Sequence, residues 1–125
     1  MIRGAVYRVD LGNARGHEQK GKRLGVVVSP SGSWLSTVTI IPTSTSAGPS
    51  LARPLIAIGG RETRALCDQI RTIDTSYISG EPVGSLTRDQ MAEIDDALTH
   101  YLGLLPDRPD DFVAPFDADA VGPRT

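Results

Sequence analysis

Three short segments of the chain carry side chains that could act together on a phosphodiester. The first, residues 15–23, combines guanidinium, imidazole, carboxylate and ammonium groups in nine positions. An arginine can hold a phosphate and stabilise the charge that builds on it, while a histidine or a carboxylate can move a proton. The composition alone is equally typical of a solvated charged loop.

The second segment is the hydroxyl-rich run Pro-Thr-Ser-Thr-Ser at residues 42–46. Hydroxyl groups donate hydrogen bonds to phosphate oxygens, and a loop that follows a strand is a good platform for them. An ordinary polar turn would have the same composition.

The third segment, Cys-Asp-Gln-Ile-Arg-Thr-Ile-Asp at residues 67–74, places ionisable groups in an apolar run. If it is one strand, Asp68 and Arg71 lie on opposite faces. Both could instead form hydrogen bonds to neighbouring loops, and Asp74 is expected to serve a turn or a cap.

The sequence lacks the residue patterns of metal sites, nucleotide-binding loops and serine-nucleophile motifs. His17 and His100 are the only histidines and Cys67 is the only cysteine, so no metal site and no cofactor are expected. There is no glycine-rich phosphate loop ending in Lys-Ser/Thr and no Gly-x-Ser-x-Gly. Cys67 is expected to be a buried, inert thiol, and His100 a surface residue.

Length and charge indicate one globular domain followed by a tail. The 125 residues are 39% hydrophobic but only 5% aromatic, which favours an aliphatic core and disfavours broad base-stacking platforms. Residues 1–104 hold 11 Lys/Arg and 10 Asp/Glu, whereas residues 105–125 hold 2 and 5. Without a disulfide, a signal peptide or a membrane span, a cytoplasmic location is expected.

Hydrophobic patterning predicts a mainly β fold. Strands are expected at residues 4–10, 24–29, 37–41, 55–58 and 64–73. Pro42 should end the third, because proline cannot donate within a central strand. Gly59-Gly60 predicts a hairpin, and residues 30–36, 43–54 and 80–84 are expected to be turns or loops, with Pro82-Val83 as a short edge piece.

One helix is strongly indicated near the end of the domain. Thr87 and Gln90 form a capping-box pattern, which Leu86 and Met91 can flank as a hydrophobic staple. A helical stripe follows: Met91, Ile94, Leu98, Tyr101, Leu102 and Leu105, ended by Gly103 or Pro106. The expected domain is thus a small curled antiparallel sheet or barrel with one helix over residues 1–105. An acidic, proline-containing tail, predicted to be flexible, occupies residues 106–125.

The order and spacing of these pieces resemble the MazF/PemK (Kid) family of type II ribonuclease toxins over about residues 2–104. The matching pieces are Arg3-Gly4 with Val9-Asp10; Gly16-His17-Glu18-Gln19 followed by Gly21 and Arg23; Val26-Val27-Val28-Ser29-Pro30; Ile41-Pro42 followed by hydroxyl residues; Asp68-Gln69-Ile70-Arg71-Thr72-Ile73-Asp74; and the closing helix. The resemblance implies an SH3-like, CcdB/MazF-type barrel with a C-terminal helix, assembled as a homodimer. It also implies metal-independent cleavage of single-stranded RNA, and inhibition by a cognate MazE-like antitoxin.

The resemblance also implies roles for individual residues. Arg23 matches the family's catalytic arginine, and Ser44 stands where the family usually has threonine, so Thr43 or Thr45 could supply the hydroxyl instead. His17 and Glu18 match loop residues that assist substrate binding or proton transfer in some members. The remaining RNA-binding candidates are Arg15, Gln19, Lys20, Lys22, Thr43, Thr45, Gln69 and Arg71.

Asp68 matches an acid implicated in the PemK/Kid branch, and this chain departs from that branch beside it. The branch has an arginine two residues before the acid, where this chain has Leu66. A scheme that pairs that arginine with the acid therefore cannot operate unchanged. Leu24 likewise replaces the family's proline after the catalytic arginine, which affects loop geometry more than chemistry.

The expected reaction is attack by the ribose 2′-hydroxyl on the adjacent phosphate, giving a 2′,3′-cyclic phosphate and a 5′-hydroxyl end. Single strands are expected because in-line attack needs an unstacked backbone. Two alternatives stay open: a gyrase-directed toxin of the CcdB type, which is a binding module, and a catalytically silent RNA-binding barrel, which the serine at position 44 would fit.

Overall fold

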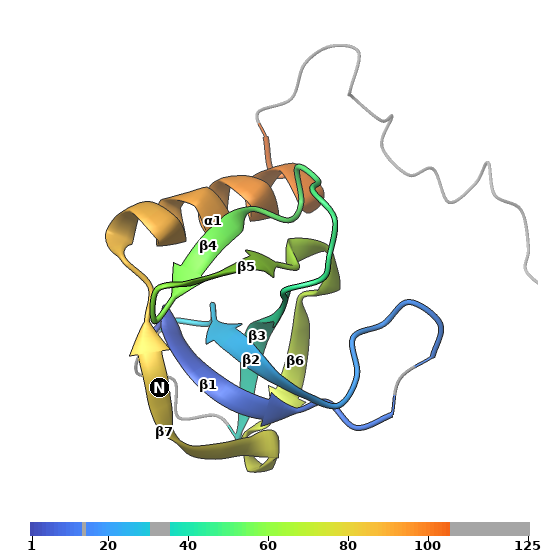
Figure 1. Cartoon of the computed structure of the whole chain (residues 1–125), viewed down its shortest axis with the longest axis vertical. Helices are drawn as coiled ribbons and strands as arrows, with labels where there is room; N and C mark the ends of the chain where they lie inside the picture. Colours follow the sequence, from blue (N-terminus) through green and yellow to red (C-terminus); the bar gives the residue numbers. More distant parts are fainter. Residues whose placement is uncertain (14, 31–35, 106–125) are drawn as a thin grey trace, which may run out of the picture.

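Antiparallel strands dominate the computed structural model, which describes residues 1–13, 15–30 and 36–105. Within these residues the chain forms seven strands, one α-helix and two short 3-10 turns (Figure 1). They are β1 (Ala5–Asp10), β2 (Lys22–Val27), β3 (Thr37–Ser44), β4 (Leu55–Ile58), β5 (Arg61–Ala65), η1 (Cys67–Gln69), β6 (Arg71–Asp74), η2 (Thr75–Tyr77), β7 (Ile78–Ser85) and α1 (Arg88–Tyr101). The tail predicted for residues 106–125, and most of the turn predicted for 30–36, lie outside the described residues.

The sheet is organised around β3. Its strand order is β4-β5-β3-β2-β1-β7, and β6 pairs with β3 as a branch from this path. The first half of β3 pairs with β6 and its last two residues pair with β5. This change of partner curls the sheet, and α1 lies against the curled sheet beside β4 and β5 (Figure 1). The expected curled antiparallel sheet with a C-terminal helix is confirmed, in the form of a half-barrel.

The prediction that Pro42 ends its strand is wrong. β3 continues to Ser44, with Pro42 fully buried and paired opposite Gly25. Proline lacks only the N–H donor, and its carbonyl oxygen still accepts a hydrogen bond from Leu66 N at 2.9 Å. Pro42 sits where β3 changes from β6 to β5, so the strand tolerates it at a bend. The loop predicted for residues 43–54 therefore begins only after Ser44.

The single strand predicted for residues 64–73 is also wrong. The segment is β5, then η1, then β6, so Asp68 and Gln69 lie in a 3-10 turn and not on the faces of a strand. Leu66 and Cys67 are fully buried, and η1 packs against α1. The apolar run that suggested a strand is thus buried beneath the helix.

Two hydrophobic clusters stabilise the half-barrel. One joins Val6, Val26 and Ile41 to Ile94 and Leu98 of α1, and the other gathers Val9, Val27, Val38, Ile40 and Ile73 on the opposite side. Successive residues of a strand point to opposite faces, so Ile40 and Ile41, both 0% exposed, belong to different clusters. Burying each such side chain contributes about 1.5–3 kcal/mol, which explains the apolar residues of β3.

The helix begins as predicted. The Thr87 side chain accepts from Gln90 N, the Gln90 side chain accepts from Thr87 N, and both bonds of the capping box are present. Gly103, with φ of 68°, ends the helix by adopting the left-handed conformation that glycine favours. The predicted stripe is buried only in part, because α1 ends at Tyr101, and Tyr101, Leu102 and Leu105 are about half exposed.

The turn predicted at Gly80–Gly84 is instead the middle of β7. This edge strand pairs with β1 through an irregular register between Val6 and Arg8, and an edge strand with such a bulge tolerates Pro82. Two other local predictions are confirmed: β4 has the expected bounds, and Asp74 caps η2 by accepting from Ser76 N at 2.8 Å. The strand predicted at residues 24–29 is instead β2, Lys22–Val27, so it begins and ends two residues earlier and includes Arg23. Among the described elements, no helix is long and apolar enough to cross a membrane.

Candidate functional site

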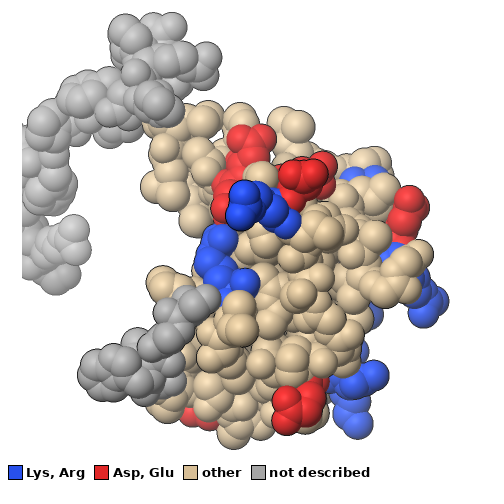
Figure 2. All heavy atoms as spheres, turned by 90° about the vertical axis from the view of Figure 1, so that its left-hand side faces the viewer, with Lys and Arg blue, Asp and Glu red and all other residues tan. Residues whose placement is uncertain are grey.

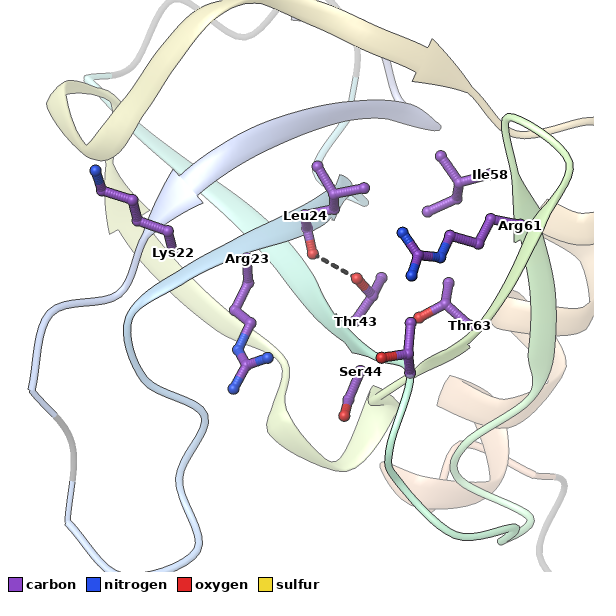
Figure 3. Close-up of a pocket in the computed structure, with 9 residues that line it drawn as sticks. Lys22, Arg23, Leu24, Thr43, Ser44, Ile58, Arg61 and Thr63 are labelled. Carbon is purple, nitrogen blue, oxygen red and sulfur yellow. Dashed lines mark hydrogen bonds between the residues drawn. The ribbon is translucent and has the colours of Figure 1, made fainter.

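A cavity of about 210 Å³ opens between β2, the end of β3 and the β4–β5 hairpin (Figure 3). We call it the Arg23 cavity. It is lined by Lys22, Arg23, Leu24, Thr43, Ser44, Thr45, Ile58, Arg61 and Thr63. It therefore brings together the predicted arginine and all three candidate hydroxyl residues, which lie about twenty positions apart in the sequence.

Arg23 reaches this cavity from the start of β2, where it pairs with Val9 of β1. Its side chain is exposed, and Nε donates to the carbonyl oxygen of Lys20 at 3.2 Å. Within the described part of the chain, the terminal nitrogens of this guanidinium have no other hydrogen bond or ion pair. These two nitrogens are the pair that binds a phosphate through parallel hydrogen bonds.

The neighbouring hydroxyl groups differ in what they can still donate. Thr43 Oγ1 donates to the carbonyl oxygen of Leu24 at 2.9 Å, so its proton is already used. Ser44 Oγ accepts from Ser46 N at 3.3 Å and lies 3.2 Å from Ser46 Oγ, an exposed hydroxyl that can itself be the donor. Ser44, although only 5% exposed, thus keeps a rotatable proton that can point into the cavity.

The opposite wall of the cavity was missed by sequence reasoning. Arg61 and Thr63 line it from β5, and neither was a candidate. Pairing in the hairpin sets Ile58 opposite Arg61 and Ile56 opposite Thr63. Ile56 and Ala65 are buried on the face of the hairpin that Thr63 and Arg61 share. The alternation Arg61-Thr63-Ala65 in the sequence was therefore a signal that Arg61 lies on the core-facing side of its strand.

A second cavity of about 550 Å³ holds the acid predicted at position 68. We call it the Asp68 cavity; it is lined by His17, Glu18, Arg53, Asp68, Gln69, Ile70 and Arg71. The structure therefore divides the predicted catalytic residues: Arg23 and Ser44 line one cavity, and His17, Glu18 and Asp68 line the other. The two are linked through β3 by the hydrogen bond from Leu66 N to the carbonyl oxygen of Pro42. Leu66 lies two residues before Asp68, and Pro42 directly precedes Thr43.

Asp68 is paired with an arginine, Arg53, which comes from the loop before β4. Arg53 Nε and Nη2 donate to the two carboxylate oxygens at 3.0 Å and 2.8 Å. Both side chains are about one quarter exposed, so water screens the pair only in part. The loop that carries Arg53 is fixed beside η1 by the hydrogen bond from Cys67 N to the carbonyl oxygen of Ala52. Leu66, which stands where the PemK/Kid branch has an arginine, is buried in the core.

The hydrogen bond from Arg53 lowers the pKa of Asp68 below its ordinary value, and burial only partly opposes this. A carboxyl whose pKa is lower in the folded than in the unfolded state contributes stability that is complete above the unfolded pKa, about 4. That contribution is lost as the pH falls through the folded pKa. Asp68 is therefore a carboxylate at neutral pH, held in place by Arg53.

We expect Asp68→Asn to lower the free energy of unfolding by about 1 kcal/mol at pH 7, a value discounted for the partial exposure of the pair. The deficit relative to the unmodified chain should shrink as the pH falls from 5 to 3, because the unfolded chain takes up a proton at Asp68 at higher pH than the folded chain does. Urea unfolding of both proteins at the two ends of this range measures it. A deficit that stays constant with pH would show that Asp68 does not stabilise the folded chain through its charge.

Gln69 positions the predicted loop against the Asp68 cavity. Its Oε1 accepts from Gln19 N at 2.6 Å, and its Nε2 donates to the carbonyl oxygen of His17 at 3.0 Å. These two bonds bring His17 and Glu18 to the cavity, and neither of their side chains has a hydrogen bond or ion pair among the described residues. Gln69 therefore serves the loop backbone, and both of its side-chain groups are already engaged.

The remaining candidates have more peripheral places. Arg15 and Lys20 are exposed on the loop and line neither cavity, whereas Arg71 lines the Asp68 cavity. Burial raises the pKa of Cys67 to about 12, which makes it the inert thiol that was predicted, and His100 is exposed on α1. Among the residues described, no three His, Cys, Asp or Glu side chains gather closely enough to hold a metal ion.

Charge elsewhere on the surface is mixed. Figure 2 shows the face at the left of Figure 1, where acidic and basic side chains are interspersed on a mostly uncharged surface. The Arg23 cavity differs from this face, because its lining includes three cationic side chains and no acidic one. A one-signed lining attracts anions even when the whole chain carries a formal net charge of −2.

Comparison with known proteins gives consistent matches along the domain. A family model described as "PemK-like, MazF-like toxin of type II toxin-antitoxin system" matches residues 2–102. A Mycobacterium tuberculosis protein named "Putative toxin Rv3098A/RVBD_3098A" is 56% identical over 105 residues, which cover 83% of this chain and 99% of that protein. Endoribonuclease PemK of Escherichia coli is 32% identical over 103 residues, covering 75% and 76%.

A solved structure has the same fold. It is an endoribonuclease from a mycobacterial species in complex with its cognate antitoxin, and it superposes with a TM-score of 0.72 at 24% sequence identity. The superposition covers 86% of this chain and 99% of that one. The family match begins before β1 and ends after α1, so it includes both cavities.

Proposed function

This chain belongs to the PemK-like, MazF-like toxin family of type II toxin–antitoxin systems, and on that basis we propose that it is a sequence-specific, metal-independent endoribonuclease acting on single-stranded RNA. The observation that carries the proposal is the cavity in which Arg23 stands beside Thr43 and Ser44 without a carboxylate. Such a lining suits a phosphodiester whose negative charge increases during reaction. We assign this activity to the domain of residues 1–105.

The reaction that suits these groups needs no external nucleophile. The 2′-hydroxyl oxygen bonds to the adjacent phosphorus, its proton passes to a base, and the bond from phosphorus to the 5′ oxygen breaks. The departing oxygen takes a proton, so the products are a 2′,3′-cyclic phosphate and a 5′-hydroxyl end. Arg23 stabilises the charge on the non-bridging oxygens, and Ser44 donates a further hydrogen bond to them.

The proton carriers belong to the loop of residues 15–20. Within the described residues, the side chains of His17 and Glu18 are unpaired at the Asp68 cavity, and such an imidazole or carboxylate can accept the 2′ proton. Asp68 suits this task less, because both of its oxygens accept from Arg53. We therefore assign Asp68, with Arg53, to positioning the substrate strand and the loop. An RNA strand that crosses the end of β3 would occupy both cavities.

Two partners complete the proposal. We propose that the chain acts as a homodimer, for which the exposed apolar side chains Tyr101, Leu102 and Leu104 offer contact surface. We also propose that a cognate MazE-like antitoxin inhibits it, as the structure of a mycobacterial endoribonuclease in complex with its cognate antitoxin suggests by its similar fold. An acidic segment of the antitoxin would neutralise the cationic lining of the Arg23 cavity.

Incubation of the purified protein with a long defined RNA in EDTA tests the function. We expect discrete fragments that end in 2′,3′-cyclic phosphate and 5′-hydroxyl groups, and no cleavage of the 2′-deoxy version of the same sequence. Binding without cleavage would support a silent RNA-binding barrel. Inhibition of gyrase supercoiling, with the RNA left intact, would support the gyrase-directed alternative. Either result would contradict the nuclease proposal.

A further inference from the structure

Arg61 stands on the wall of the Arg23 cavity that faces β2. Gly59 and Gly60, with φ of 59° and 79°, form the two-residue turn of the β4–β5 hairpin, and this left-handed pair suits the twist of a tight hairpin. The turn sets Arg61 directly opposite Ile58, so that both side chains line the mouth of the cavity. Figure 3 shows the guanidinium of Arg61 extending from β5 toward Thr43 and Thr63.

Neither Arg61 nor Thr63 is engaged by the part of the protein that the structure describes. Among residues 1–13, 15–30 and 36–105, the Arg61 guanidinium has no hydrogen bond and no ion pair, and the Thr63 hydroxyl has no partner although the residue is only 7% exposed. Glu62, the nearest acid in sequence, points to the opposite face of β5 by strand alternation. A hydroxyl and a guanidinium, both without a partner among these residues, therefore line the same cavity.

The electrostatics of the cavity favour an anionic occupant. Lys22, Arg23 and Arg61 carry like charges around about 210 Å³, and no carboxylate in the lining compensates them. The apolar walls at Leu24 and Ile58 displace water, and charge interactions strengthen where water is displaced. Such an arrangement costs repulsion in the empty protein, which a bound phosphate would relieve.

We propose that Arg61 is a second phosphate-binding arginine of this cavity, holding a backbone phosphate of the RNA strand together with Thr63 on the wall opposite Arg23. The inference rests on the proposed function and extends it, since it assigns the β4–β5 hairpin to the substrate site. Arg61 acts on the bound strand through ground-state contact. The occupant is a phosphodiester, because it presents anionic oxygens to a guanidinium and to a hydroxyl donor.

The salt dependence of binding tests this role of Arg61. The probe is a short single-stranded RNA with a 2′-O-methyl group at every position, which 2′-hydroxyl attack cannot cleave. Removing one cation that neutralises a phosphate of a single strand should reduce the slope of log K against log salt by about 0.7. We expect Arg61→Gln to show this reduction with about tenfold weaker binding, as for removal of one charged hydrogen bond. Arg61→Lys, which keeps the charge, should retain the slope of the unmodified chain.

Arg88→Gln is the matched control. Arg88 is exposed at the start of α1 and lines neither cavity, so the same change of charge there should leave slope and affinity unchanged. If Arg61→Gln keeps the full slope, even with weaker binding, phosphate binding by Arg61 is refuted while the nuclease proposal stands. If the unmodified chain fails to bind the probe and fails to cleave RNA, both proposals are refuted together.

Discussion

Replacing Arg23 with alanine should give a folded protein that cleaves RNA at least about 100-fold more slowly, since removing one group that stabilises transition-state charge typically has an effect of this size. The structural cost should be small, because the side chain is exposed and its one intramolecular bond among the described residues is the 3.2 Å contact from Nε to the Lys20 carbonyl. Single-turnover cleavage at saturating RNA, with thermal unfolding of the same samples, measures both quantities.

Arg23→Lys separates charge from geometry. Lysine keeps the positive charge but cannot form two parallel hydrogen bonds with a phosphate. It should therefore recover RNA binding while recovering only part of the rate. Arg88→Gln again serves as the control of equal charge change. Full cleavage by a folded Arg23→Ala protein would remove this guanidinium from the mechanism.

Local signals in the sequence were sufficient where one segment determines its own structure. Thr87 and Gln90 specify the start of α1 through bonds between residues three apart, and the structure contains both bonds. Gly59-Gly60 similarly specifies the hairpin between β4 and β5. In each case the stabilising interactions lie within the segment itself, so distant parts of the chain have little influence on its structure.

The sequence-based predictions fail where a segment distant in the sequence determines the local structure. Pro42 could remain in β3 because the strand changes partners there, a fact that only the sheet topology contains. The segment around Cys67 gave the apolar signal of a strand because Leu66 and Cys67 are fully buried, and Cys67 shares a core cluster with Ile94 and Leu98 of α1. Burial beneath a helix and burial within a sheet leave the same hydrophobic pattern in a short segment.

The candidate site shows the same division. Arg23 and the hydroxyl run were recognisable through the resemblance to the MazF/PemK family, and their meeting in one cavity agrees with the role proposed for them. Arg53 was not recognisable, because it becomes a neighbour of the site only through tertiary structure. The alternation of Arg61 with Thr63 and Ala65 indicated on which side of its strand Arg61 lies, but not which cavity it lines. Arg53 shows why a motif can lose an arginine at one position and still keep its carboxylate paired: a guanidinium can arrive from any segment that ends nearby.

Ser44→Ala should lower the rate of cleavage by about 100-fold, whereas Thr43→Val should lower it little. Ser44 has a hydroxyl proton that is free to turn toward a phosphate oxygen, and a preorganised donor of this kind is typically worth that factor. The proton of Thr43 already bonds the Leu24 carbonyl oxygen at 2.9 Å. Valine at position 43 removes that bond and should cost about 1 kcal/mol of stability instead.

Ser44→Ala should therefore change the cleavage rate, and Thr43→Val should change the stability. Measuring the cleavage rate and the free energy of unfolding of each variant distinguishes the roles of the two hydroxyls. Ser44→Thr should preserve the rate, because the donor is kept and a methyl group merely restricts its rotamer. If Thr43→Val were the slower enzyme, the Thr43 hydroxyl would have to leave Leu24 when RNA binds. Retention of full cleavage by Ser44→Ala would transfer the donor role to Thr45, which lines the same cavity from just beyond β3.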